Sequence, residues 1–262
     1  FYTHTPPSPM LRSLVGSEMC IRDRFIGHHI MTPKEGVAIH INAFNFPIWG
    51  MLEKIAVNLM AGVPAIVKPA TLTCFLTELM VREIVDSKIL PEGSLQLICG
   101  SARGIIDHVQ TGDVVTFTGS ADTGKMLKSQ PRLIEESVPF NMEADSLNCS
   151  VLGEDSIPGT AEFYIFIKEV LKEMTVKAGQ KCTAVRRVIV PEKLVEDVQI
   201  ALGKRLSKTT IGDPSIEGVR MGSLAGKEQK IEVKTVNHND RYQKNDHVKV
   251  CLLYTSPSPR DS

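Results

Sequence analysis

Short apolar segments alternate with helix-length amphipathic segments between residues 36 and 127, and this alternation constrains the fold more than any other feature of the sequence. Buried strands are predicted where β-branched and apolar residues run together, at 36–41, 64–68, 95–99 and 114–117. Helices are predicted between and after them, at 48–60, 75–85, 102–109 and 120–127. Strands that alternate with helices form right-handed crossovers and a parallel sheet, so the predicted fold class is α/β. Such sheets bind ligands outside the carboxyl ends of their strands.

The alternation of short apolar segments with helix-length segments changes after about residue 140. Strands are expected at 138–142, 149–152 and 186–190. Two strongly amphipathic segments predict helices over 163–176 and 194–206. We interpret this region as the start of a second α/β unit.

The composition limits the class of protein. A chain of 262 residues with 42% hydrophobic residues is typical of a globular protein. Thirty Lys and Arg balance thirty Asp and Glu, whereas nucleic-acid binders usually carry a basic excess. No apolar run reaches the roughly 18 residues of a membrane span, and no secretion signal is visible. Six cysteines without a Cys-x-x-Cys pair disfavour a disulfide scaffold and a zinc ribbon. We therefore expect a cytoplasmic enzyme with free thiols, no metal, and neither nucleic acid nor membrane as partner.

The two ends of the chain differ from its middle. Residues 1–24 contain Thr5-Pro-Pro-Ser-Pro9 and show neither helical nor strand periodicity. The chain ends in Thr255-Ser-Pro-Ser-Pro-Arg-Asp-Ser262. Ser-Pro runs at both ends resemble translated adaptor DNA, so we exclude them from fold prediction. We expect residues 1–24 to be a non-native or disordered tail, and residues 230–262 stay unassigned or non-native.

Two segments are candidates for binding a phosphate group. Thr118-Gly-Ser120 follows a strand and precedes a helix, whose free amides and dipole attract an anion such as pyrophosphate. A capped helix after a tight turn is the alternative, because a G-x-G-x-x-G fingerprint is absent. Lys68 ends a strand, from which it can reach ribose hydroxyls or a phosphate. The alternative for Lys68 is a solvated side chain at an exposed strand end.

Cys182 is the candidate nucleophile. It lies in the polar segment Lys177-Ala-Gly-Gln-Lys-Cys182, where nearby lysines favour a reactive thiolate. Cys99, in contrast, stands in an apolar run that is typical of a buried structural cysteine. An incidental loop cysteine is the alternative interpretation of Cys182.

Two further side chains suit chemistry at a carbonyl group. Asn45 stands between a strand and a helix, so its amide either donates to an oxyanion or caps the helix, and capping is the better local choice. Glu143 ends a strand among mostly uncharged residues. A partly buried carboxylate there can act as a base, and an ion pair to a nearby lysine is equally compatible with the sequence.

Taken together, these residues resemble the aldehyde dehydrogenase superfamily. The motifs stand in the family's order: Asn45-Phe-Pro47, Lys68-Pro-Ala70, Phe117-Thr-Gly-Ser120 with Gly124, Glu143, and Gly179-Gln-Lys-Cys182. Asp213-Pro214 and Gly222-Ser-Leu224 are similar to a later family landmark. The resemblance covers about 25–229 and leaves both tails unmatched. It implies a Rossmann-like dinucleotide-binding domain over 25–144 and part of a second, catalytic α/β domain over 145–229, a truncated aldehyde dehydrogenase-like fold.

The resemblance implies a mechanism for an NAD(P)-dependent aldehyde dehydrogenase. The Cys182 thiolate attacks the aldehyde carbon, and the Asn45 side chain and the Cys182 backbone N–H hold the oxyanion. Hydride transfer to the nicotinamide leaves a thioester, from which Glu143 releases the acid by activating water. An acylating relative, which passes the acyl group to coenzyme A, needs no such base, so Glu143 favours hydrolysis. Segments 42–50 and 142–149 resemble most the family members of phenylacetate degradation, which implies a CoA-linked semialdehyde from an opened aromatic ring.

The resemblance also implies the cofactor contacts. They are carried by Lys68, Pro69, Ala70, Thr71, Phe117, Gly119, Ser120 and Gly124. Many relatives have a glutamate where this chain has Thr71, and that glutamate binds ribose hydroxyls and repels a 2′-phosphate. Lys68 can pair with such a phosphate. We therefore expect NADP to be accepted and to be preferred over NAD.

Some family features have no match in this sequence. They are the Glu-Ile-Phe-Gly-Pro-type motif, the first part of the cofactor domain, the second half of the catalytic domain and the oligomerising strand. The parent enzyme is expected to be a homo-oligomer. Two other functions stay open: a dinucleotide-binding module without chemistry, and an inert fragment without a stable fold.

Overall fold

The computed structural model describes residues 32–101, 104–227, 229–231, 243–245 and 248–252. The chain divides into two compact units, Phe1–Lys34 and Glu35–Ser262, and every element below belongs to the second unit. The tail expected at 1–24 lies outside the described residues. Within the described part of the chain, no helix has the length and apolar character needed to cross a bilayer.

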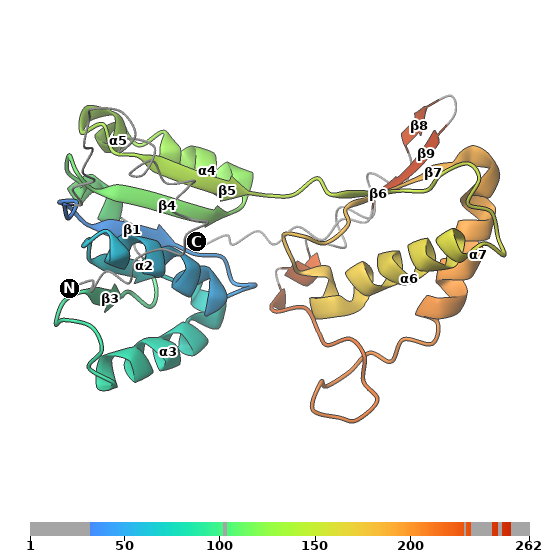
Figure 1. Ribbon diagram of the computed structural model, residues 1–262, viewed down its shortest axis with the longest axis horizontal. Helices are drawn as coiled ribbons and strands as arrows, with labels where there is room; N and C mark the ends of the chain where they lie inside the picture. Colours follow the sequence, from blue (N-terminus) through green and yellow to red (C-terminus); the bar gives the residue numbers. More distant parts are fainter. Residues whose placement is uncertain (1–31, 102–103, 228, 232–242, 246–247, 253–262) are drawn as a thin grey trace, which may run out of the picture. The chain divides into compact units, whose positions relative to one another are not determined.

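A five-stranded parallel sheet forms the first half of this unit (Figure 1). Its strands are β1 (Ala38–Ile41), β2 (Ala65–Lys68), β3 (Leu95–Leu97), β4 (Val114–Gly119) and β5 (Phe140–Ala144). They stand in the order β3-β2-β1-β4-β5, and every neighbouring pair is parallel. The parallel α/β sheet predicted from the alternation is thus confirmed. Strands β2 and β3 follow β1 on one side of the sheet, and β4 and β5 lie on the other side of β1. The point where the strand order reverses direction, the topological switch point, therefore lies between β1 and β4.

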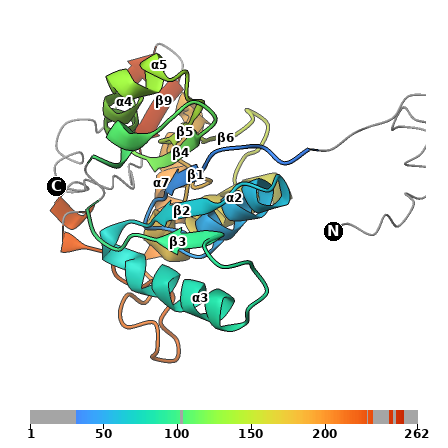
Figure 2. The same ribbon diagram turned by 90° about the vertical axis from the view of Figure 1, so that its left-hand side faces the viewer.

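Helices cover the sheet and bury two apolar clusters. The helices are α2 (Trp49–Met60), α3 (Cys74–Asp86), α4 (Ala121–Lys128) and α5 (Pro131–Glu135), and Figure 2 shows α2 and α3 beside β2 and β3. Neighbours in β2 belong to different clusters: Val67 packs with Met51, and Ile66 packs with Val115. Successive side chains of a strand point to opposite faces, so both faces of the sheet are buried. The helix expected at 102–109 is a short 3-10 turn, η2 (Ile105–His108).

A second, four-stranded sheet follows in the order β6-β7-β9-β8. It contains β6 (Cys149–Val151), β7 (Arg187–Pro191), β8 (Gln243–Asn245) and β9 (Val248–Leu252), and only β6 and β7 are parallel. Helices α6 (Ala161–Thr175) and α7 (Val195–Leu206), both predicted, pack their apolar residues with those of β7. The strand expected at 138–142 forms β5 of the first sheet.

Strand β9 lies in the segment that the sequence analysis left unassigned or non-native. It pairs with β7 over five residues, from Arg187 opposite Leu252 to Pro191 opposite Val248. The expectation that residues 230–262 are unassigned or non-native stays a prediction.

Candidate active site

A cavity of about 330 Å³ lies at the carboxyl ends of β1, β4 and β5 in the first sheet. It is lined by Asn42 and Asn45 after β1, by Thr118 and Gly119 at the end of β4, and by Glu143 in β5. The cavity therefore lies beside the switch point between β1 and β4, where a sheet of this topology binds ligands.

Residues that follow the first sheet complete the lining of this cavity. They are Ala144, Asp145 and Ser146 after Glu143, and Cys182, Thr183 and Arg186 from the segment before β7. Cys182, Asn45 and Glu143 thus line a single cavity, although they are far apart in the sequence. The fold brings together the three side chains that the sequence analysis selected for chemistry.

Asn45 does not cap the helix that follows it. The N-cap position of α2 is occupied by Ile48, and no side chain there makes a capping hydrogen bond. A cap at Asn45 would act on the N–H groups two or three residues later, and Pro47 has no N–H to offer. The capping interpretation is therefore wrong, and the half-buried Asn45 lines the cavity instead.

Glu143 is exposed, so the expected partial burial of its carboxylate is wrong. The reason lies in the topology, because β5 is the edge strand of the sheet. Thr118, its register partner in β4, donates a hydrogen bond of 3.4 Å to Glu143 Oε2. A threonine, rather than the lysine of the alternative interpretation, contacts the carboxylate.

Lys54 is a cavity residue that the sequence analysis missed. Its ammonium donates to Thr118 Oγ1 at 2.5 Å and to Asn42 Oδ1 at 3.0 Å, so it reaches Glu143 through one hydroxyl group. Burial lowers the pKa of Lys54, and the negative charge of Glu143 opposes part of that shift. A lysine inside a helical segment rich in apolar residues was the signal that could have identified it.

Cys182 is exposed and lies in the loop between the 3-10 turn η3 (Val176–Gly179) and β7. Lys181, expected to favour the thiolate, is paired with Glu173 of α6 at 2.8 Å. Lys177 donates to the backbone carbonyl of Asn45 at 2.5 Å, and its ammonium lies 3.6 Å from the centroid of the Phe46 ring. Both ammonium groups are thus bound to partners other than the sulfur, and their contacts shape the loop.

Cys74, Cys99 and Cys149 are also free thiols. Cys99 is exposed, so the prediction of a buried structural cysteine is wrong. Its run of apolar residues ends just before it, where β3 stops at Leu97. Burial and the neighbouring Cys74 thiol raise the pKa of Cys99.

The residues expected to contact the cofactor are divided between the cavity and the ends of neighbouring strands. Gly119 lines the cavity. The others do not: Lys68, Pro69, Ala70, Thr71, Phe117, Ser120 and Gly124. Lys68 is only 3% exposed because β2 is flanked by β1 and β3, so the solvated alternative is wrong. Thr71 is exposed and begins the 3-10 turn η1 (Thr71–Thr73).

Two of these residues have structural tasks in the helix α4. The hydroxyl of Ser120 accepts a hydrogen bond of 3.3 Å from the N–H of Thr123, which confirms the predicted cap. A Cβ at Gly124 would lie 2.7 Å from the Met142 side chain and 3.1 Å from that of Phe117. The glycine is therefore required for close packing of α4 on β4 and β5. In the described part of the chain, no group of three His, Cys, Asp or Glu is placed to hold a metal ion.

Comparison with known proteins gives a family match over most of the chain. A sequence model described as the aldehyde dehydrogenase family matches residues 10–251. This match extends beyond the 25–229 covered by the motifs, so the expectation that both tails are unmatched is wrong for 10–24 and 230–251.

Two curated relatives are semialdehyde dehydrogenases. A 3,4-dehydroadipyl-CoA semialdehyde dehydrogenase from Aromatoleum evansii is 48% identical over 207 residues, which cover 79% of this chain and 40% of that protein. An alpha-ketoglutaric semialdehyde dehydrogenase from Bacillus subtilis is 30% identical over 198 residues, covering 74% of this chain and 39% of that protein. The chain thus spans about 40% of the length of these relatives.

Solved structures resemble the fold. Betaine aldehyde dehydrogenase from Staphylococcus aureus in complex with NAD+ superimposes with a TM-score of 0.69 at 25% identity, over 78% of this chain and 40% of that chain. An oxidoreductase from Marinobacter aquaeolei gives a TM-score of 0.69 at 25% identity, over 80% of this chain and 44% of that chain.

Proposed function

The chain belongs to the aldehyde dehydrogenase family, and from this premise we propose that its cavity oxidises an aldehyde with Cys182 as the nucleophile. One observation carries the proposal: Cys182, Asn45 and Glu143 line the same cavity. The family resemblance inferred from the motifs is confirmed by the family match. The catalytic roles of Cys182, Asn45 and Glu143 are what we propose here.

The first step is attack of the Cys182 thiolate on the aldehyde carbon, which forms a C–S bond and an oxyanion. Two donors serve the oxyanion: the side-chain amide of Asn45 and the backbone N–H of Cys182. Among the described residues, the Cys182 N–H donates to no protein group. It is therefore available to the substrate. Loss of one such donor typically lowers the rate by about 10²–10³.

A bound nicotinamide dinucleotide, which Gly119 and Lys68 at the strand ends would help to hold, would supply the hydride acceptor for the tetrahedral carbon. What remains on Cys182 is a thioester, which needs water and a base to be released as a carboxylic acid. Glu143 is the base in this proposal, and the hydroxyl of Thr118 orients its carboxylate. Transfer of the acyl group to coenzyme A is the alternative fate, and the carboxylate in the cavity favours hydrolysis.

The residues at the strand ends fit a dinucleotide. Gly119 ends β4 at the switch point and the first turn of α4 follows it, and Lys68 ends β2 on the other side of β1. The similarity to a relative in complex with NAD+ supports a nicotinamide dinucleotide as cofactor. We propose that NADP is preferred, because the exposed Thr71 brings no negative charge that would repel a 2′-phosphate. A kcat/KM that favours NAD by a factor of ten or more would contradict this preference.

The substrate class follows from a relative. A protein with 48% identity to this chain is named for a CoA-linked semialdehyde. We propose a semialdehyde that carries a coenzyme A thioester as the substrate of the whole enzyme to which this sequence belongs.

The test compares the chain with Cys182→Ala. We expect aldehyde-dependent reduction of NADP, seen as absorbance of the reduced cofactor, and its loss in the variant with unchanged cofactor affinity. Iodoacetamide should modify Cys182 faster than Cys74, Cys99 or Cys149. Equal activity of the two proteins, or cofactor binding without any aldehyde oxidation, would contradict the proposed function. The second outcome would favour a dinucleotide-binding module.

A further inference from the structure

The loop that carries Cys182 has a strained backbone. Lys177 and Ala178 have φ angles of 54° and 52°, and Gly179 follows with a φ of 73°. Residues other than glycine rarely adopt this left-handed backbone conformation, which costs about 1–2 kcal/mol per residue. A strained segment persists only when its surroundings hold it. The side chains that hold this loop are therefore of interest.

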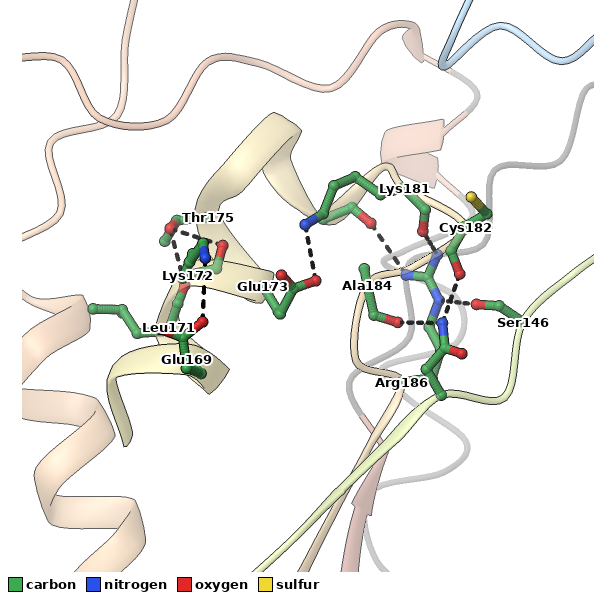
Figure 3. A network of polar contacts seen from close by, with 12 residues as sticks. Ser146, Glu169, Leu171, Lys172, Glu173, Thr175, Lys181, Cys182, Ala184 and Arg186 are labelled. Carbon is green, nitrogen blue, oxygen red and sulfur yellow. Dashed lines mark hydrogen bonds and ion pairs between the residues drawn. The ribbon is translucent and has the colours of Figure 1, made fainter. Parts of the chain in front are cut away.

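Arg186 is one of them. Its side chain is buried, with 6% of the residue exposed, directly before β7. One guanidinium nitrogen donates to the carbonyl of Gly179 at 3.2 Å and another to the carbonyl of Lys181 at 2.7 Å. The third nitrogen, Nε, donates to the hydroxyl of Ser146 at 3.0 Å, which fixes the plane of the guanidinium (Figure 3).

Asn148 holds the next part of the same loop. Its Nδ2 donates to the carbonyl of Cys182 at 2.6 Å and to that of Ala184 at 3.3 Å. The backbone carbonyl of Asn148 in turn accepts from the N–H groups of Arg186, at 2.8 Å, and Arg187, at 3.1 Å. The side chains of Arg186 and Asn148 thus bind four backbone carbonyls of the loop, those of Gly179, Lys181, Cys182 and Ala184.

These contacts fix where the backbone N–H of Cys182 points. The carbonyl of Lys181 and the N–H of Cys182 belong to one planar trans peptide group, in which C=O and N–H point in opposite directions. Because the guanidinium of Arg186 holds that carbonyl, the N–H must point away from it. Among the described residues this N–H donates to no protein group.

We propose that Arg186 is a positioning residue that orients the Lys181–Cys182 peptide group and so sets the backbone half of the oxyanion site, with Asn148 doing the same for the next peptide group. The inference rests on the proposed function. It assigns a task to Arg186 that its neighbour Arg187, which is exposed, does not have. A direct contact with substrate is a different role, and it predicts a change in KM rather than in kcat.

The test needs two reactions of the same sulfur. Hydrolysis of p-nitrophenyl acetate passes through an oxyanion: the thiolate attacks the ester carbonyl, the C–O bond to p-nitrophenolate breaks, and water releases acetate from the thioester. Alkylation by iodoacetamide displaces iodide and forms no oxyanion. Neither reaction needs the cofactor. A residue that orients the N–H should therefore affect the first reaction and spare the second.

We expect Arg186→Met to lower kcat for the ester by up to about 10²–10³, the effect of losing one oxyanion donor, with KM nearly unchanged. Arg186→Lys keeps a cation and part of the hydrogen bonding, so its loss should be smaller. Asn148→Asp replaces the donor by an acceptor at an exposed position and should also lower kcat. The alkylation rate of Cys182 should stay within a factor of two in all three variants. Arg187→Lys is the matched control and should equal the unmodified chain in both reactions.

Each other outcome is decisive. Ester hydrolysis and alkylation that fall together in Arg186→Lys and Asn148→Asp would show a general collapse of the loop and overturn the inference. Unchanged kcat in these two variants, with melting temperatures like that of the unmodified chain, would overturn it as well. A rise in KM alone would assign Arg186 to substrate binding instead. If the unmodified chain shows no Cys182-dependent ester hydrolysis, the proposed function itself fails, and this inference fails with it.

Discussion

The cavity is lined from two sides that are built in different ways. On the sheet side, Thr118 and Glu143 stand at the ends of parallel strands, directly opposite each other in the register of β4 and β5, and Asn45 lies in the connection that follows β1. On the loop side, the segment 177–186 carries Cys182, and side-chain donors bind its carbonyls. The backbone ladder of β4 and β5 positions Thr118 and Glu143, and a few side chains position the loop that carries Cys182.

This difference decides how far a substitution acts. A residue on the sheet side can lose its functional group while the strands keep their pairing, because the ladder does not depend on that side chain. On the loop side, a left-handed backbone at Lys177 and Ala178 is balanced by contacts of single side chains. Residues that never touch a substrate should therefore influence chemistry on the loop side and not on the sheet side.

The largest effect is expected for Asn45→Ala, which removes an oxyanion donor from the sheet side. The kcat for p-nitrophenyl acetate should fall by about 10²–10³, because the developing charge loses one of its two proposed donors. Alkylation of Cys182 by iodoacetamide and the melting temperature should not change. An equal drop in alkylation would mean that the two sides are not independent, and the comparison would fail.

A smaller effect is expected for Lys177→Met, because Lys177 connects the two sides. Its ammonium donates to the Asn45 carbonyl and lies over the Phe46 ring. Loss of one exposed charge-assisted hydrogen bond and one cation–π contact, together about 1–2 kcal/mol, should lower kcat about tenfold. Lys177→Arg keeps a cation at this place and serves as the control. A Lys177→Met variant that matches Lys177→Arg in kcat would show that the connection has no influence on the reaction.

The sequence predicts the sheet side better than the loop side, for physical reasons. The apolar runs of β1 and β2 are buried on both faces, so composition alone identifies them. The residues of a strand do not by themselves indicate whether that strand lies at the centre or at the edge of the sheet. The burial of Lys68 and the exposure of Glu143 both follow from strand order, and both were predicted wrongly.

Loop geometry and distant pairings are beyond a local prediction. Arg186 and Arg187 are adjacent and identical in type, yet one is buried and the other is exposed. Only the three-dimensional arrangement of carbonyls around Arg186 distinguishes them. The pairing of β7 with β9 joins residues 187–191 to 248–252, with no periodic signal between them. The three residues selected for chemistry were found because side-chain type and family motif coincided at Asn45, Glu143 and Cys182.

A third prediction concerns the cofactor end of the sheet side. Thr71→Glu places a carboxylate at the exposed start of η1, next to the end of β2. One added charge near a phosphate in water is worth about 1 kcal/mol, so NADPH affinity should fall about fivefold while NADH affinity is kept or improved. Thr71→Gln, of similar size and without charge, is the control, and quenching of protein fluorescence or nucleotide fluorescence gives the affinities. Equal losses for both nucleotides in Thr71→Glu would place the 2′-phosphate elsewhere.

The smallest effect concerns stability rather than reaction, and it tests how firmly the sheet side is held. His40 in β1 is 2% exposed, and its ring nitrogens contact Thr116 Oγ1 of β4 at 2.8 Å and Asn58 Oδ1 of α2 at 2.7 Å. Burial lowers the pKa of His40 below its ordinary value of 6.5, and the hydrogen bond to Asn58 opposes part of that shift.

Below pH 6.5 the unfolded chain therefore binds a proton at His40 that the folded chain does not yet bind. The free energy of unfolding should fall as the pH drops from 7, by at most about 1.4 kcal/mol per pH unit from this group, and the fall should stop below the folded pKa. His40→Gln, which keeps a polar side chain and cannot titrate, should show a flatter dependence of the melting temperature on pH. Parallel curves for the two proteins would contradict this. If the prediction holds, acid weakens the contacts among β1, α2 and β4 together. Asn45 and Thr118 are then displaced only when the sheet itself opens. The loop side, in contrast, can change through the rotation of a single peptide group.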